Sequence, residues 1–143
     1  DITIREDLVF PIEDRSVLRG YDEYADIPED AMVRVYSLGE VMAEKVVALT
    51  DRARNEPRDL YDAWYLTAGG HVDLPDLVDA IGQKLAFRGK GLADVRGEFE
   101  AKESRFRRLW EPRLAGQMVD LPEFDEVYRS VRRALRQAGI TGK

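Results

Sequence analysis

The sequence predicts a mainly α-helical α+β protein in which short N-terminal β-strands precede a helical bundle. Residues 1–10 and 32–36 carry the patterns of short strands. From Ser37 onward, apolar residues recur at helical spacing, and glycine or proline separates the periodic segments. We therefore divide the chain into a β-rich part, residues 1–36, and a helical part, residues 37–143.

The predicted strands are short and have few partners. Residues 1–10 alternate polar and apolar side chains, residues 13–31 are acid-rich with glycine and proline and predict a loop, and residues 32–36 predict a second strand. Two strands alone are marginally stable. The chain opens without Met inside a strand-like pattern, so we expect further strands from residues upstream of Asp1 or from another chain.

Five helical segments are predicted. Ser37 followed by Glu40 forms a capping-box pattern, which predicts a helix from Ser37 to about Arg54. Pro112 is expected to kink or break the fourth segment. The remaining segments are 58–66, 75–87, 92–118 and 122–138.

Composition excludes several kinds of site. The chain has no cysteine and one histidine, His71, which excludes disulfides, thiolate metal sites and a cysteine nucleophile and leaves no basis for a histidine metal site. No run of about 18 apolar residues predicts a membrane span, and no secretory leader pattern is visible. These features fit a cytoplasmic protein.

Charge is distributed unevenly. Residues 1–101 carry a net charge of −10, and residues 102–143 carry +4. Residues 102–113 mix basic and aromatic side chains, as nucleic-acid binders do, although an amphipathic helix with an arginine-rich solvent face gives the same pattern. On the last helix we expect Arg132 and Arg136 to contact a phosphate backbone; alternatively, the arginines there pair with the acidic part of the chain.

Lys45 occupies an unusual position in the first predicted helix. An apolar stripe surrounds it at helical spacing, formed by Leu38, Val41, Met42, Ala48 and Leu49. Two interpretations remain open: the stem of Lys45 packs while its ammonium group reaches water, or the ammonium group faces a cleft and binds phosphate.

Two acids open the second predicted helix. Asp59 and Asp62 are spaced i, i+3 and share a face, and Arg58 stands four residues before Asp62, where a local ion pair could form. Acids are also common in a first helical turn, because they interact favourably with the helix dipole and bond free N–H groups. A functional and a purely local role are therefore both open.

Two motifs occur in an order typical of one family. They read Val-Tyr-Ser-Leu-Gly-Glu-Val-Met-Ala-Glu-Lys, ending at Lys45, and Pro-Arg-Asp-Leu-Tyr-Asp, ending at Asp62. Together they resemble the AbiEii/AbiGii nucleotidyltransferase toxins of bacterial abortive-infection and toxin–antitoxin systems. Residues 121–127 are similar to the entry into the family's C-terminal helix, and the resemblance covers about residues 1–135.

The resemblance implies a polymerase-β-like nucleotidyltransferase core followed by a helical domain, with residues 1–36 as a remnant of the core sheet. It implies transfer of a nucleotide from an NTP to RNA, with tRNA 3′ ends as the substrate class and an antitoxin protein as a partner. The complete enzyme is expected to use Mg²⁺ and NTP.

The resemblance also implies roles for particular residues. Lys45, Asp59 and Asp62 match functional positions of the family, and Asp1 stands where a third acid of the core is expected. The expected substrate-binding residues are Arg52 and Arg58, beside these motifs, and Arg132 and Arg136, which are expected from the charge pattern.

The chain departs from the family in one respect. The Gly-Ser loop and the Asp-x-Asp motif do not occur in these 143 residues, although paired carboxylates are needed to hold Mg²⁺ in two-metal transfer. We therefore expect no metal site, no cofactor and no catalysis from this chain alone, which would be a fragment, a split subunit or a degenerate homologue. The alternative function is a non-catalytic helical module that docks an antitoxin or RNA.

Overall fold

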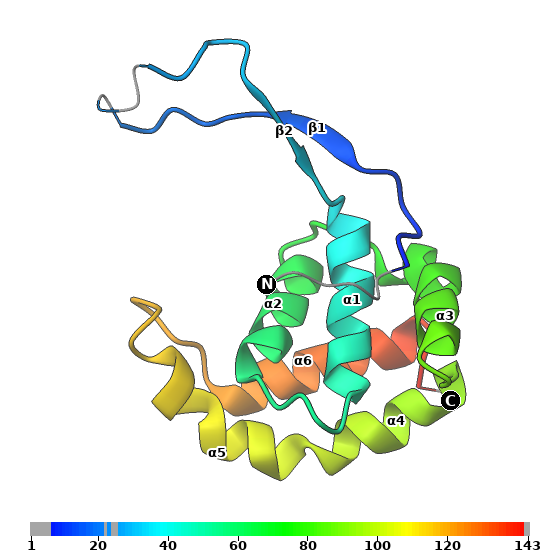
Figure 1. Ribbon diagram of the computed structural model, residues 1–143. Helices are drawn as coiled ribbons and strands as arrows, with labels where there is room; N and C mark the ends of the chain where they lie inside the picture. Colours follow the sequence, from blue (N-terminus) through cyan, green and yellow to red (C-terminus); the bar gives the residue numbers. More distant parts are fainter. Residues whose placement is uncertain (1–6, 22, 24–25, 142–143) are drawn as a thin grey trace.

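The computed structural model describes residues 7–21, 23 and 26–141, and this part of the chain is mainly helical (Figure 1). A two-stranded antiparallel sheet precedes the helices, which confirms the predicted α+β class. The elements are β1 (Glu13–Ser16), β2 (Met32–Val35), α1 (Leu38–Thr50), α2 (Pro57–Ala68), the 3₁₀ helix η2 (Leu74–Leu77), α3 (Val78–Phe87), α4 (Leu92–Ala101), α5 (Glu103–Leu114) and α6 (Phe124–Gln137).

The sheet is a hairpin that projects from the helices near the start of α1 (Figure 1). The second strand is confirmed, but the first is displaced: residues 7–10 form no strand, residues 1–6 lie outside the described part, and β1 falls in the predicted loop. Asp14 lies opposite Arg34 in the register, and such an opposite-charge pair stabilises neighbouring strands. The prediction relied instead on alternating polar and apolar residues, a pattern that does not mark β1. The backbone of residues 7–10 is bound instead by side chains of α1 and α3.

The start of α1 follows the predicted cap in part. The Oγ atom of Ser37 accepts a hydrogen bond from the backbone N–H of Glu40 at 3.1 Å. The carboxylate of Glu40, however, accepts hydrogen bonds from the backbone N–H groups of Val9 and Phe10 at 3.2 and 3.0 Å. The capping-box pattern thus predicts the start of the helix correctly. Glu40, however, binds the backbone of a segment about 30 residues earlier in the chain.

The long segment predicted over 92–118 is two helices. The break lies at Lys102, between α4 and α5, and Pro112 lies inside the last turn of α5 without ending it. Of the expected kink or break at Pro112, the break does not occur. At the break between α4 and α5, Lys102 is 5% exposed as a whole residue, and its side chain contacts the carboxyl end of α1.

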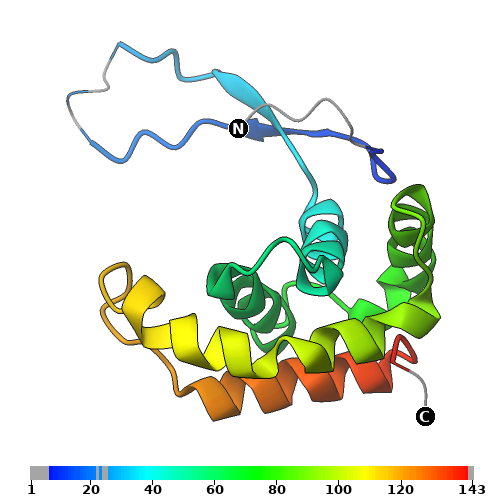
Figure 2. The ribbon, with the colours of Figure 1, turned by 60° about the horizontal axis from the view of Figure 1, so that its bottom comes forward.

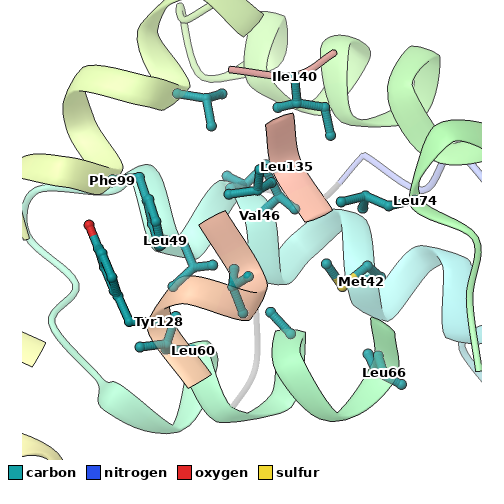
Figure 3. Packing of buried hydrophobic residues seen from close by; sticks show 14 of the residues in the cluster. Met42, Val46, Leu49, Leu60, Leu66, Leu74, Phe99, Tyr128, Leu135 and Ile140 are labelled. Carbon is teal, nitrogen blue, oxygen red and sulfur yellow. The ribbon is translucent and has the colours of Figure 1, made fainter. Parts of the chain in front are cut away.

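The core takes buried side chains from α1, α2, α3, α4, α5 and α6. Met42, Val46 and Leu49 of α1 face Leu60 and Leu66 of α2 and the buried face of α6 (Figure 3). Figure 2 shows α4 and α5 running alongside α6, and Phe99 stacks on Tyr128 there with ring centroids 4.8 Å apart. Within the described residues, no helix is long and apolar enough to cross a membrane.

Candidate functional site

Three of the predicted site residues meet between α1 and α2. The Nζ atom of Lys45 lies 2.9 Å from Oδ1 of Asp59 and 2.6 Å from Oδ2 of Asp62. The two acids lie on one face of α2, as their i, i+3 spacing predicted, and Lys45 reaches both from the neighbouring helix. The Arg58–Asp62 pair suggested by spacing is replaced by the pair between Lys45 and Asp62.

Helix packing directs these side chains toward one another. Leu60 and Ala63 of α2 are fully buried, and Met42 and Val46 of α1 are fully buried as well. Asp59 therefore lies beside the packed face of α2 and is 1% exposed as a whole residue. A carboxylate at such a depth costs free energy unless cations or donors surround it.

Lys45 lies at the edge of the buried face of α1, which corrects the prediction that it occupies the middle of an apolar stripe. Leu38 is 47% exposed, and Val41 and Ala48 are half-buried. The side chain of Lys45 is 18% exposed. The side chain is therefore partly open to solvent while its ammonium group is paired.

Arg54 is the second cation at Asp59, and the sequence analysis did not identify it. Its Nε atom donates to Oδ2 of Asp59 at 2.6 Å, and one terminal nitrogen donates to Oδ1 at 3.1 Å. This is the two-point contact that a planar guanidinium makes with a carboxylate. The available signal was the position of Arg54 in the short loop before an acid that helix packing would bury.

The pKa values reflect this pairing. Burial alone would lower the pKa of Lys45, but its hydrogen bonds to Asp62 and Asp59 outweigh burial and raise that pKa. Burial alone would raise the pKa of Asp59, but the bonds from Arg54 and Lys45 hold that pKa below its ordinary value. Lys45, Arg54 and Asp59 are therefore charged at neutral pH.

A pocket of about 190 Å³ opens beside this cluster. Its lining includes Lys45, Arg54 and Asp59, together with Arg88, which follows α3. The charged residues that line the pocket are balanced in sign, with three cations, Lys45, Arg54 and Arg88, and three acids, Glu44, Asp51 and Asp59. An anion that enters must therefore compete with carboxylates for the cations.

A buried ion-pair network holds the amino end of α1. The Nζ atom of Lys84 on α3 lies 2.6 Å from Oε1 of Glu40 and 2.6 Å from Oε1 of Glu44. It also donates to the backbone carbonyl of Asp7 at 2.6 Å. Burial would lower the pKa of Lys84, but its bonds to the two glutamates raise it. The network ties α1 to α3 and to the segment before the hairpin.

A second buried lysine holds the carboxyl end of α1. Nζ of Lys102 donates to the carbonyl oxygens of Ala48 and Asp51 at 3.1 and 2.9 Å, where a helix end leaves acceptors free. The same ammonium group lies 4.8 Å from the ring centre of Phe106. Burial lowers the pKa of Lys102 to about 8. Contacts at both ends thus fix the helix that carries Lys45.

The other predicted site residues lie elsewhere. Arg52 pairs with Glu98 of α4 at 2.8 Å, with 83% of its side chain exposed. Arg132 pairs with Glu100 at 3.1 Å, and it lines a separate groove with Arg136. Arg58 is exposed at the start of α2. Asp1 lies outside the described residues.

The described residues do not form a fitting site for Mg²⁺. Asp59 and Asp62 are bound to Lys45, and Asp59 also to Arg54. No group of three or more His, Asp or Glu side chains in the described part of the chain is arranged to hold a metal ion. We therefore derive no metal-dependent step from these residues.

Comparison with known proteins adds one match. A model of the family described as nucleotidyl transferase AbiEii toxin, type IV TA system, matches residues 1–134. Searches of the curated proteins and of the solved structures found no match.

Proposed function

Because this chain belongs to the AbiEii family of nucleotidyl transferase toxins of type IV toxin–antitoxin systems, we propose that it is the helical part of an enzyme that transfers a nucleotide from an NTP to RNA. The expected acceptor is the 3′ end of a tRNA. The expected partners are a nucleotidyltransferase core upstream of these residues and an antitoxin protein.

The observation that carries the proposal is the position of Lys45. Its ammonium group is held by two carboxylates of unequal exposure, at the edge of a pocket. The side chain of Asp59 is 2% exposed and is also bound by Arg54, whereas the side chain of Asp62 is 30% exposed. Asp59 is therefore the fixed partner and Asp62 the one that an incoming anion can replace.

This asymmetry suggests how the residues act. A phosphate oxygen of the NTP takes the place of Asp62 at Lys45, while Asp59 and Arg54 keep the ammonium group in position. A lysine ammonium is a compact point charge with three donors, suited to the charge that develops on a leaving pyrophosphate. Asp62, once released, is free to face solvent or the acceptor.

These residues supply part of the chemistry. The Gly-Ser and Asp-x-Asp motifs of the family are absent from the 143 residues, so the triphosphate grip and the metal ligands would belong to the upstream core. In the complete enzyme, Mg²⁺ would neutralise phosphate charge there. The helical part would contribute Lys45.

The test is nucleotide transfer by the natural polypeptide that contains these residues. Each labelled NTP is incubated with Mg²⁺ and a tRNA pool, and label joined to RNA is measured. We expect transfer that fails when Lys45 is replaced by Met. Absence of transfer with all NTPs, from a polypeptide that carries the core motifs and is folded, would contradict the proposal.

A second candidate is a non-catalytic module that docks an antitoxin or RNA. The arginine-lined groove between the start of α2 and α5 favours it, because such a surface can bind a polyanion without chemistry. The two candidates differ in one measurement: a module binds its partner with the same affinity after Lys45→Met and transfers nothing in either form.

A further inference from the structure

A second arginine-lined surface lies next to the pocket of Lys45. A groove of about 570 Å³ runs between the start of α2, the loop before it and α5. The arginines that line this groove, called the α5 groove below, are Arg54, Arg58, Arg105, Arg108 and Arg113. Glu56 is the one acid that lines it.

Most of this positive charge is not neutralised within the protein. Arg54 is bound to Asp59, and Arg113 lies 3.7 Å from Glu56. In the part of the chain that the structure describes, Arg58, Arg105 and Arg108 form no ion pair, and all three are exposed. Like charges gathered this closely repel one another, although the chain as a whole has a net charge of −6 and carboxylates are abundant.

The lining favours a nucleic-acid backbone over a protein partner. Leu109 is the one apolar residue that lines the α5 groove. A stable protein interface needs an apolar or aromatic centre, whereas contacts to phosphates are made mainly by arginine and lysine and carry no sequence preference.

The α5 groove also adjoins the candidate site. Arg54 lines both the groove and the pocket of Lys45, so the two share a wall. We propose that the α5 groove binds the sugar-phosphate backbone of the acceptor RNA and leads its 3′ end toward Lys45 and Asp62. This inference rests on the proposed function for the identity of the polyanion.

The groove between α4 and α6 provides the comparison. It measures about 370 Å³, and Glu100 within it lies 3.6 Å from Arg96 and 3.1 Å from Arg132. Like the α5 groove, it is lined by five arginines and one acid, and two of its arginines are paired, so the charge of its lining matches that of the α5 groove. It shares no lining residue with the pocket of Lys45. Arg129 and Arg133 of this groove allow the same charge reversal at a different place.

The experiment measures binding of a fluorescent RNA hairpin with a single-stranded 3′ end to the full chain, between about 50 and 200 mM KCl. The double variant Arg105→Glu/Arg108→Glu should weaken binding about tenfold or more and should flatten the salt dependence by about 0.7 per lost contact in the log–log slope. The control Arg129→Glu/Arg133→Glu, with the same change of net charge, should change the affinity at most about threefold, through screened long-range charge. Unchanged melting temperatures establish that both variants fold.

Three outcomes would overturn the inference. In the first, both double variants weaken RNA binding equally. In the second, only Arg129→Glu/Arg133→Glu weakens RNA binding. In the third, Arg105→Glu/Arg108→Glu binds RNA as the parent does but no longer binds an acidic protein partner. The assay uses no NTP, so it is separable from the proposed function. If RNA binds through the α5 groove but no nucleotide is transferred, the inference about the groove holds and the proposed enzyme function fails. If nucleotide is transferred but the Arg105→Glu/Arg108→Glu variant binds RNA with unchanged affinity, the enzyme function holds and the inference about the groove fails.

Discussion

The Nζ atom of Lys45 lies 2.9 Å from Oδ1 of Asp59, and the side chain of Asp59 is 2% exposed. The two residues belong to different helices, and the loop between these helices supplies Arg54 as the second cation. A buried acid thereby holds a lysine at the edge of a pocket. In the proposed function, Asp59 positions Lys45, and Lys45 contacts the ligand.

Replacing Lys45 by Met should lower nucleotide transfer by the complete enzyme about 10²-fold or more, the scale for the loss of one electrostatic stabiliser. Met keeps most of the side-chain volume, and Asp59 retains Arg54, so the fold should persist. Steady-state transfer rates measured beside circular-dichroism melting curves separate the two effects. Full activity of Lys45→Met would assign Lys45 a packing role.

The 143-residue chain by itself should transfer no nucleotide to RNA with any NTP and Mg²⁺, because the Asp-x-Asp pair is absent from it. The measurement is label incorporation into RNA, with the complete enzyme as the positive control. Robust transfer by the purified chain would mean that other residues form the metal site.

Replacing Asp59 by Asn should lower the free energy of unfolding by about 1–3 kcal/mol, since a buried charge cluster loses its central carboxylate. Lys45 keeps Asp62, and the side chain of Arg54 is 52% exposed, so neither cation is left fully unpaired and dry. The measurement is urea unfolding at neutral pH. The control Asp73→Asn changes an exposed acid that makes no side-chain cap bond, and it should have little effect.

Asp59 and its cations should also make the stability of the protein sensitive to acid. The pKa of Asp59 is lowered in the folded state, so its contribution to stability is fully present above the unfolded pKa of about 4 and is lost as the pH falls through the lower, folded value. Unfolding free energies measured from pH 6 down to about 3 should fall less steeply for Asp59→Asn than for the parent chain. Parallel pH profiles would contradict this assignment.

Lys102 should make the protein more stable at mildly alkaline pH. Burial lowers its pKa to about 8, so the folded state loses this proton before the unfolded state, whose lysine pKa is about 10.4. The unfolded state then binds more protons, and the free energy of unfolding rises between these two values with a slope that approaches about 1.4 kcal/mol per pH unit.

In the variant Lys102→Met, the free energy of unfolding should not rise over this pH range. Lys90→Met is the matched control, because Lys90 donates to the carbonyl of Thr50 near the same helix end, and this variant should keep the rise. The test window runs from pH 8 to 9.5, about one and a half units inside the expected range. If the free energy of unfolding of the parent chain does not change across it, Lys102 is not neutral and buried in the folded state.

Local patterns predicted most helix positions and part of the site. Ser37 marked the start of α1, the glycines and Pro57 separated the helices, and the spacing of Asp59 and Asp62 placed both acids on one face of α2. These features depend on neighbours within about one helical turn, which the sequence displays directly.

The tertiary structure decided which charges are buried and what each of them pairs with. Glu40 binds the backbone before the hairpin and Lys84 instead of closing a capping box, and Lys102, at the break between α4 and α5, donates to a carbonyl at the end of α1. Arg54 became part of the site through the burial of Asp59. The physical reason is that the cost of desolvating a charge depends on the helices packed around it, and residues far apart in the sequence supply both that burial and the partner that offsets it.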